Sequence, residues 1–131
     1  AQLTWAATLS NGRISAATRA DYADAAAVAL LADDSAGQVL ELGGPSFTLD
    51  ELAATVASVS GREVTATEVS AEELTAILVG AGLPQGYAQV LASADEGISR
   101  GELEVSTGDL ERLIGRPPTT LREAVEQTLA P

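Results

Sequence analysis

The chain has 131 residues, a formal net charge of −12 and neither cysteine nor histidine. Disulfides, thiolate nucleophiles, cysteine-based zinc sites and histidine general bases are therefore excluded, and the negative charge argues against binding to nucleic-acid phosphates. No stretch approaches the roughly 20 apolar residues of a membrane span. The acidic pairs Asp33 with Asp34 and Glu72 with Glu73 are too isolated to hold a metal ion. We expect a cytoplasmic protein with no membrane span and no metal.

The first third of the chain predicts a strand, a helix and a second strand. Residues 14–17 follow a Gly-Arg lead-in and indicate a short strand, and the Ala-rich residues 20–32 are expected to form a helix with Asp21 at its positive end. Residues 38–42 (QVLEL) alternate apolar and polar side chains, which is typical of a strand. Residues 43–45 (GGP) break that strand, and we expect a turn there because the proline lacks a backbone donor.

Four helix starts carry a capping box, a Ser or Thr followed three residues later by an acidic residue. These boxes are Thr48 with Glu51, Ser70 with Glu73, Ser106 with Asp109, and Thr120 with Glu123. The box that ends in aspartate is weaker, because Asp is shorter than Glu. The boxes place helices at residues 49–60, 71–80, 108–114 and 121–129. Gly61 fits the position that ends a helix.

Between these helices, residues 63–69 (EVTATEV) alternate and are rich in β-branched side chains, which predicts a strand. A helix is expected at residues 85–94, after an interruption at 82–84, and a loop at 95–103. Arg116, in a stiff Gly-Arg-Pro-Pro turn, is expected to be structural. Strands that alternate with helices indicate parallel pairing with crossover helices. We therefore expect an α/β fold: the C-terminal part of a larger doubly wound, Rossmann-like sheet, with a helical cap.

Four segments, taken in this order and at this spacing, resemble one family. They are residues 12–27 (GRISAATRADYADAAA), 39–52 (VLELGGPSFTLDEL), 82–94 (GLPQGYAQVLASA) and 113–125 (LIGRPPTTLREAV). They extend the resemblance over most of the chain, which is similar to the C-terminal half of NmrA-like proteins, atypical members of the short-chain dehydrogenase/reductase superfamily. Within that family the resemblance is to type-2 NAD(P)H:quinone oxidoreductases.

The resemblance implies that residues 1–131 are a single substrate-side domain, and that the N-terminal, dinucleotide-binding half of the parent is absent. It implies NADP or NAD as the cofactor of the full-length parent, and a small apolar substrate such as a quinone. No cofactor and no activity are expected for this chain alone, because it has no Gly-rich phosphate-binding loop after a first strand.

The expected partner is the missing N-terminal half or a second copy of the chain. Two alternative functions stay open. One is an NmrA-like regulatory protein that senses NAD(P) without turnover, and the other is a stand-alone protein-interaction domain. Reduction of a quinone by the full-length parent would separate an enzyme from a sensor.

By the same resemblance, the corner after the first strand would face the cofactor and the substrate. The candidate cofactor-binding residues are Thr18 and Arg19, and the candidate substrate pocket is formed by Tyr22, Leu83, Tyr87 and Leu91. One alternative stays open, in which Thr18 only caps the helix and the Arg19 guanidinium pairs with a carboxylate. Asp21 or Asp24 would supply that carboxylate. Catalytic residues stay unknown, because Tyr22 lacks the lysine partner of the superfamily's catalytic tyrosine.

Overall fold

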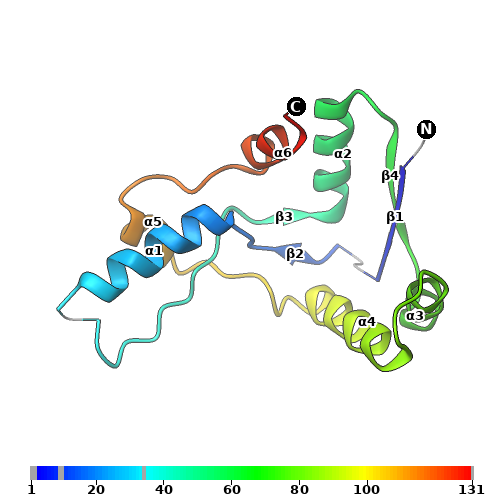
Figure 1. Cartoon of the computed structure of the whole chain (residues 1–131), viewed down its shortest axis with the longest axis horizontal. Helices are drawn as coiled ribbons and strands as arrows, with labels where there is room; N and C mark the ends of the chain where they lie inside the picture. The colour runs from blue at the N-terminus through cyan, green and yellow to red at the C-terminus, as the bar shows by residue number, and fades with distance from the viewer. Residues whose placement is uncertain (1–2, 9–10, 34, 131) are drawn as a thin grey trace.

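The computed structural model describes residues 3–8, 11–33 and 35–130. Within these ranges the chain forms short strands and six helices (Figure 1). The strands are β1 (Leu3–Ala7), β2 (Arg13–Ile14), β3 (Phe47–Thr48) and β4 (Val64–Glu68). The helices are α1 (Arg19–Leu31), α2 (Leu49–Ser60), α3 (Ala71–Gly80), α4 (Gln85–Ser99), α5 (Asp109–Ile114) and α6 (Leu121–Leu129).

The strands pair into two small sheets. β1 and β4 run parallel, in a register that places Ala7 opposite Glu68. β2 and β3 run antiparallel, with Arg13 opposite Thr48 and Ile14 opposite Phe47. Because β3 leads directly into α2, the second pairing fixes the start of α2 beside β2.

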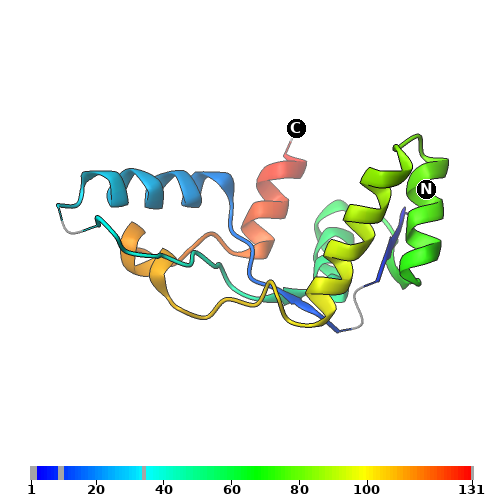
Figure 2. The same ribbon diagram turned by 90° about the horizontal axis from the view of Figure 1, so that it is seen from below.

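The helices form three groups along an elongated molecule (Figures 1 and 2). α1 packs against α5 at one end, α3 packs against α4 at the other, and α2 lies between them against α6 and β4. Aromatic residues make up only 3% of the chain, so small and medium side chains fill its core. The buried apolar residues are Ala7, Ala25, Leu49, Ala53, Leu74, Ala88, Ala92, Ile98, Leu110 and Val125.

Three of the four expected capping boxes are confirmed, at Thr48, Ser70 and Thr120. In each box the hydroxyl accepts from the backbone N–H three residues on, and the glutamate side chain accepts from the N–H of the capping residue. Because two backbone donors are satisfied at each start, α2, α3 and α6 begin where the sequence predicts. Gly61 ends α2 as expected, in the left-handed conformation with φ of 66°.

The fourth expected box, at Ser106, is wrong. α5 begins after Gly108, which has φ of 73° and makes no side-chain cap. The Asp109 carboxylate lies 2.7 Å from the Arg112 guanidinium, and the Asp109 N–H donates to the Thr107 hydroxyl at 3.3 Å. A short Asp side chain engaged with an arginine one turn on does not reach back to the position that a glutamate would cap.

The predicted strand at residues 38–42 is also wrong, because no strand forms there. No strand of the described part of the chain pairs with this segment, and side chains bind its backbone instead. The Glu41 N–H donates to the Asp109 carboxylate at 3.3 Å, and the Glu41 carbonyl accepts from the Thr107 hydroxyl at 2.6 Å. Conversely, β1 and β3 are not predicted by the sequence. The strand expected at 14–17 is largely wrong, because β2 shares only Ile14 with it.

α4 continues to Ser99, five residues beyond its predicted end, and replaces most of the expected loop. Gly97 and Ile98 are buried in this extension. The buried Gly12 approaches it so closely that a Cβ on Gly12 would lie 2.6 Å from the Ile98 carbonyl oxygen. The last turn of α4 is therefore stabilised by packing against the segment before β2, which local sequence does not encode.

Candidate functional site

The candidate site lies at the corner where β2 leads into α1. Thr18 caps α1 from an extended conformation, and its hydroxyl accepts from the Asp21 N–H at 3.1 Å. The same hydroxyl donates to the Asp21 carboxylate at 2.9 Å. Asp21 is completely buried, although it lies in the first turn of a helix of which most residues are exposed. Its position near the positive end of α1 favours the charged carboxylate.

Asp21 joins this corner to the turn before α6. Its carboxylate accepts from the Thr119 N–H at 3.0 Å and lies 2.7 Å from the Arg116 guanidinium, which also contacts Asp24 at 2.8 Å. Burial by itself would raise the pKa of Asp21. The hydrogen bonds from Thr119, Thr18 and Arg116 outweigh it and lower the pKa from the ordinary value of 3.8 to about 2. We call these contacts the Asp21 network.

The Asp21 network forms one side of a pocket of about 340 Å³, the corner pocket. The end of β2, the start of α1, the segment leading into β3, and α6 all contribute to its wall. Its lining residues are Ala16, Ala17, Thr18, Arg19, Pro45, Phe47, Thr119, Thr120, Leu121, Ala124, Gln127 and Thr128. Apolar side chains mixed with a few polar groups are typical of pockets for small organic molecules.

Several hydroxyl protons in this lining are already engaged. Thr18 donates to Asp21, Thr120 donates to its capping-box glutamate, and Thr128 donates to the Ala124 carbonyl. Arg19 is exposed at the rim and forms no ion pair within the described residues, so its guanidinium is available to a ligand. The Gln127 side chain also has donors to offer, because no described residue binds its amide. The arrangement can therefore bind an uncharged carbonyl compound or an anionic group at its rim.

The structure brings Thr18 and Arg19 together in the corner pocket. The alternative in which Arg19 pairs with Asp21 or Asp24 is not formed, because Arg116 contacts both carboxylates. Tyr22 lies beside the corner, half-buried, and its hydroxyl accepts from the Ala17 N–H at 3.2 Å. It does not line the pocket.

The other predicted pocket residues, Leu83, Tyr87 and Leu91, are not gathered with Thr18 and Arg19. They lie in the turn before α4 and in its N-terminal half, which both views place away from α1 (Figures 1 and 2). Leu83 and Leu91 are half-buried, whereas Tyr87 is exposed.

Sequence reasoning missed several residues of the corner. Arg116 was placed only in a stiff turn, and Thr119, Phe47 and Gln127 were not singled out. The signal available for Arg116 was its isolation: it is one of only seven basic residues in a strongly acidic chain. In a chain with so many carboxylates, an arginine is expected to form an ion pair, but the fold decides which carboxylate it contacts.

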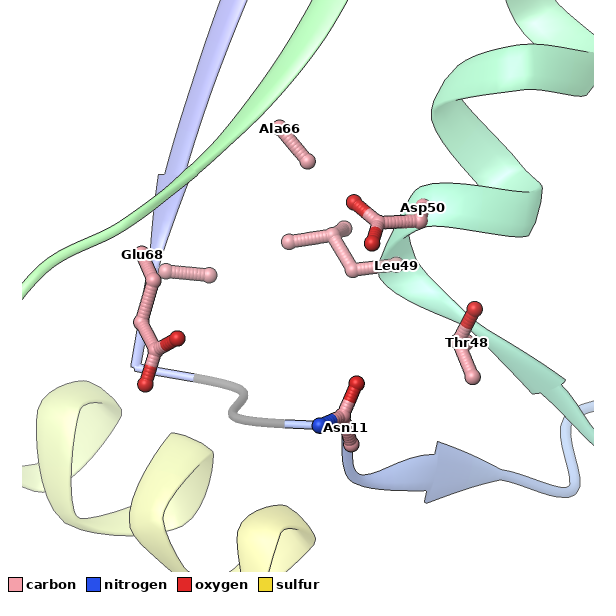
Figure 3. A pocket seen from close by; sticks show the side chains of 7 residues that line it. Asn11, Thr48, Leu49, Asp50, Ala66 and Glu68 are labelled. Atoms are coloured by element: carbon pink, nitrogen blue, oxygen red, sulfur yellow. The ribbon is translucent and has the colours of Figure 1, made fainter.

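A second, smaller pocket of about 210 Å³ lies between the end of the β1–β4 sheet and the start of α2 (Figure 3). Figure 3 shows the Asp50 side chain directed from α2 into this space, with Asn11 and Glu68 at its border. Two carboxylates make it unsuitable for a pyrophosphate. The described residues contain no group of three side chains able to hold a metal ion, and no described helix is long and apolar enough to cross a membrane.

Comparison with known proteins identifies relatives that match most of the chain. No protein-family model matches it. Quinone oxidoreductase 2 of Escherichia coli (strain K12) is 45% identical over 116 residues, which are 88% of this chain and 41% of that protein. The crystal structure of this NADPH-dependent enzyme superposes with a TM-score of 0.90 at 40% identity, over 95% of this chain and 46% of the enzyme.

A second solved relative is the triphenylmethane reductase of Citrobacter sp. complexed with NADP(H). It has a TM-score of 0.89 at 35% identity, over 96% of this chain and 44% of that one. The chain thus spans somewhat less than half the length of the proteins it matches. The expected fold class, part of a Rossmann-like α/β reductase, is confirmed. The chain is homologous to the NAD(P)-binding reductases that include quinone oxidoreductase 2, and its resemblance to the NmrA-like, type-2 quinone oxidoreductases is confirmed.

Proposed function

We propose that this chain forms the substrate-side portion of an NAD(P)H-dependent oxidoreductase that reduces quinones. The observation that carries the proposal is the 45% identity to quinone oxidoreductase 2 over 88% of the chain. The corner pocket supports it, because it combines an apolar wall with free donors from Arg19 and Gln127 that suit a quinone carbonyl. Tyr22, Leu83, Tyr87 and Leu91 stay predictions for the substrate pocket.

NADP(H) is the cofactor we propose for the longer protein, because two solved relatives are complexes with NADPH or NADP(H). The residues of this chain offer the cofactor only one contact, at the rim of the corner pocket. The only glycine pair that follows a predicted strand and precedes a helix is Gly43 with Gly44, and a Cβ on Gly44 would clash with the Ala16 carbonyl oxygen. That glycine is therefore used for close backbone packing, not to cradle a phosphate. Arg19 remains the residue suited to a phosphate or ribose.

The nicotinamide, when bound, supplies the hydride, and the protein supplies orientation. In this proposal Arg19 and Gln127 hold the polar end of a ligand by hydrogen bonds. Phe47 and Leu121 exclude water from its apolar face. The Asp21 carboxylate holds Thr18 and Thr119 together on one side of the pocket, because both bind the same oxygen, and Asp21 itself does not touch the ligand.

The test is NADPH-dependent reduction of a simple benzoquinone by the full-length protein. Arg19→Ala should weaken cofactor or quinone binding at least about tenfold, because a hydrogen bond to a charged group contributes roughly 1.5–3 kcal/mol. Arg62→Ala is the matched control, since Arg62 is exposed and outside the corner pocket. Turnover that is absent while NADPH still binds would support a sensing role in place of the enzyme.

The isolated 131-residue chain should not bind NADPH, because it lacks the Gly-rich loop that receives a pyrophosphate. Titration calorimetry of the chain with NADPH measures this directly. A micromolar dissociation constant would contradict the assignment of cofactor binding to the other half of the protein.

A further inference from the structure

The chain contains a single asparagine, Asn11, and the residue that follows it is Gly12. Asn11 is exposed and has φ of 55°, the only positive value of a non-glycine residue in the described part of the chain. Asparagine tolerates this left-handed conformation better than most residues do. The Asn11–Gly12 step lies just outside β2, which begins at Arg13. The pairing of β2 with β3 therefore does not hold the peptide group of this step.

The two groups that can react with each other in this step are free. Neither the Asn11 side-chain amide nor the Gly12 N–H forms a hydrogen bond within residues 3–8, 11–33 and 35–130. Asparagine is a thermolabile residue, because its Cγ lies within reach of the next backbone nitrogen. Glycine leaves that approach unhindered, since it has no Cβ. Asn11 therefore combines exposure, an unbonded amide and a following glycine.

We propose that Asn11 is a site of spontaneous deamidation, and that its isoaspartate product loosens the packing of Gly12 against α4. The Gly12 nitrogen loses its proton and bonds to the Asn11 Cγ. The Cγ–Nδ2 bond breaks, and Nδ2 leaves as ammonia with that proton, which leaves a five-membered imide ring. Water then opens the ring and returns a proton to the Gly12 nitrogen. Opening at one carbonyl gives aspartate, and opening at the other gives isoaspartate, in which the backbone runs through the side-chain carboxyl.

The packing of Gly12 makes isoaspartate the more damaging product. Gly12 is buried, and a Cβ on it would lie 2.6 Å from the Ile98 carbonyl oxygen in the last turn of α4. Isoaspartate adds one carbon, about 1.5 Å of backbone, directly before this glycine. Because Gly12 has no room to move toward α4, we expect the added length to push the start of β2 away from that helix.

Both products also add a negative charge to an acidic part of the molecule. Asn11 borders the pocket of about 210 Å³ together with Asp50 and Glu68 (Figure 3). A third carboxylate at this border is repelled by the other two, in a chain whose net charge is already −12. The charge alone therefore predicts a small loss of stability, and the altered backbone of isoaspartate predicts a further loss.

The reaction is measured on the folded chain at mildly alkaline pH. Trypsin releases residues 1–13 as one peptide, because the chain has no lysine and Arg13 is its first arginine. We expect this peptide to gain the mass difference between an amide and a carboxyl group at Asn11, and to be labelled by isoaspartyl methyltransferase. Asn11→Gln is the matched control: its imide would be a six-membered ring, so the gain should be at least about tenfold slower.

Equal rates for the chain and for Asn11→Gln would overturn the proposal. A folded chain that stays unmodified, while the same chain in urea reacts, would also overturn it, because the fold would then protect this step.

The effect on packing is measured by urea denaturation of the unmodified chain, freshly prepared Asn11→Asp and the purified isoaspartate form. Asn11→Asp carries the same new charge on an ordinary backbone, so it isolates the effect of charge. We expect the urea midpoint to fall slightly in Asn11→Asp and further in the isoaspartate form. Equal midpoints for these two proteins would reject the loosening of Gly12.

Discussion

The corner around Asp21 is held by residues far apart in the sequence, whereas the α3–α4 hairpin is held by neighbours along the chain. In the corner, one buried carboxylate binds Thr119, 98 residues away, together with Arg116. In the hairpin, Ala88 and Ala92 are buried and let the helices approach, and no ion pair of the described residues joins α3 to α4. The corner therefore depends on a few specific contacts, and the hairpin on distributed packing of small side chains.

The strongest test of this contrast is a pair of glycine substitutions. Gly44→Ala should lower the free energy of unfolding by about 3 kcal/mol, because the new Cβ would clash with the Ala16 carbonyl and backbone cannot rotate away. Gly86→Ala in α4 should raise the free energy of unfolding by about 0.5–1 kcal/mol, because alanine is the better helix former. Outside the neighbouring part of α4, no atom lies within 4 Å of the position that the new Cβ would take. Urea denaturation of both variants measures the difference. Equal effects would remove the distinction between the two regions.

Asp21→Asn should remove the contribution of the corner to the loss of stability at acid pH. Because the folded-state pKa of about 2 lies below the ordinary 3.8, the carboxylate contributes about 2 kcal/mol of stability above pH 4. That contribution is lost as the pH falls through 2. The variant should be less stable than the parent chain at pH 7, and the gap should close between pH 4 and pH 2.

The control for this pH dependence is Asp24→Asn. Asp24 contacts the same Arg116, but its side chain is 58% exposed, so its ion pair is screened by water and contributes less than about 1 kcal/mol. The measurement is the urea midpoint at several pH values for the three proteins. A gap between Asp21→Asn and the parent that is as wide at pH 2 as at pH 7 would show that shape, not charge, makes Asp21 important.

A smaller loss of stability should distinguish a capping box that forms from one that does not. Ser70→Ala should cost about 1 kcal/mol, because it removes the hydroxyl that caps α3 in the hairpin. Ser106→Ala should cost almost nothing, because α5 begins at Gly108 without a side-chain cap. Chemical denaturation of the two variants tests the assignment, and a loss at Ser106 as large as at Ser70 would mean that the expected box forms after all.

Local signals predicted the helices of this fold better than its strands. The starts of α2, α3 and α6 follow from a hydroxyl and a glutamate three residues apart, and both groups act within one turn. A strand depends on its partner. β1 pairs with β4, some 60 residues away, and its sequence, LTWAA, does not alternate clearly. The segment 38–42 alternates well, but no strand of residues 3–8, 11–33 or 35–130 pairs with it.

In the candidate site, too, local sequence predicts some residues, and others depend on the fold. Thr18 and Arg19 were found because a strand end followed by a helix start can be recognised within a few residues. Arg116, Phe47 and Gln127 reach the corner from three other segments, and only the folded chain brings them there. The alternative in which Arg19 pairs with Asp21 or Asp24 is not formed for this reason, since the distant Arg116 contacts both carboxylates.

Ser15 joins three segments that are far apart in the sequence. This buried residue donates its N–H to the Leu103 carbonyl, accepts from the Gly44 N–H, and accepts from the Val105 N–H through its hydroxyl. The last contact closes a loop of 90 residues, whereas the α3–α4 hairpin closes over four. Closing a long loop costs more chain entropy, and such contacts form late. On the ribosome, the residues of the hairpin are synthesised before Val105, so Ser15 gains this partner only after the sequence of the hairpin is complete.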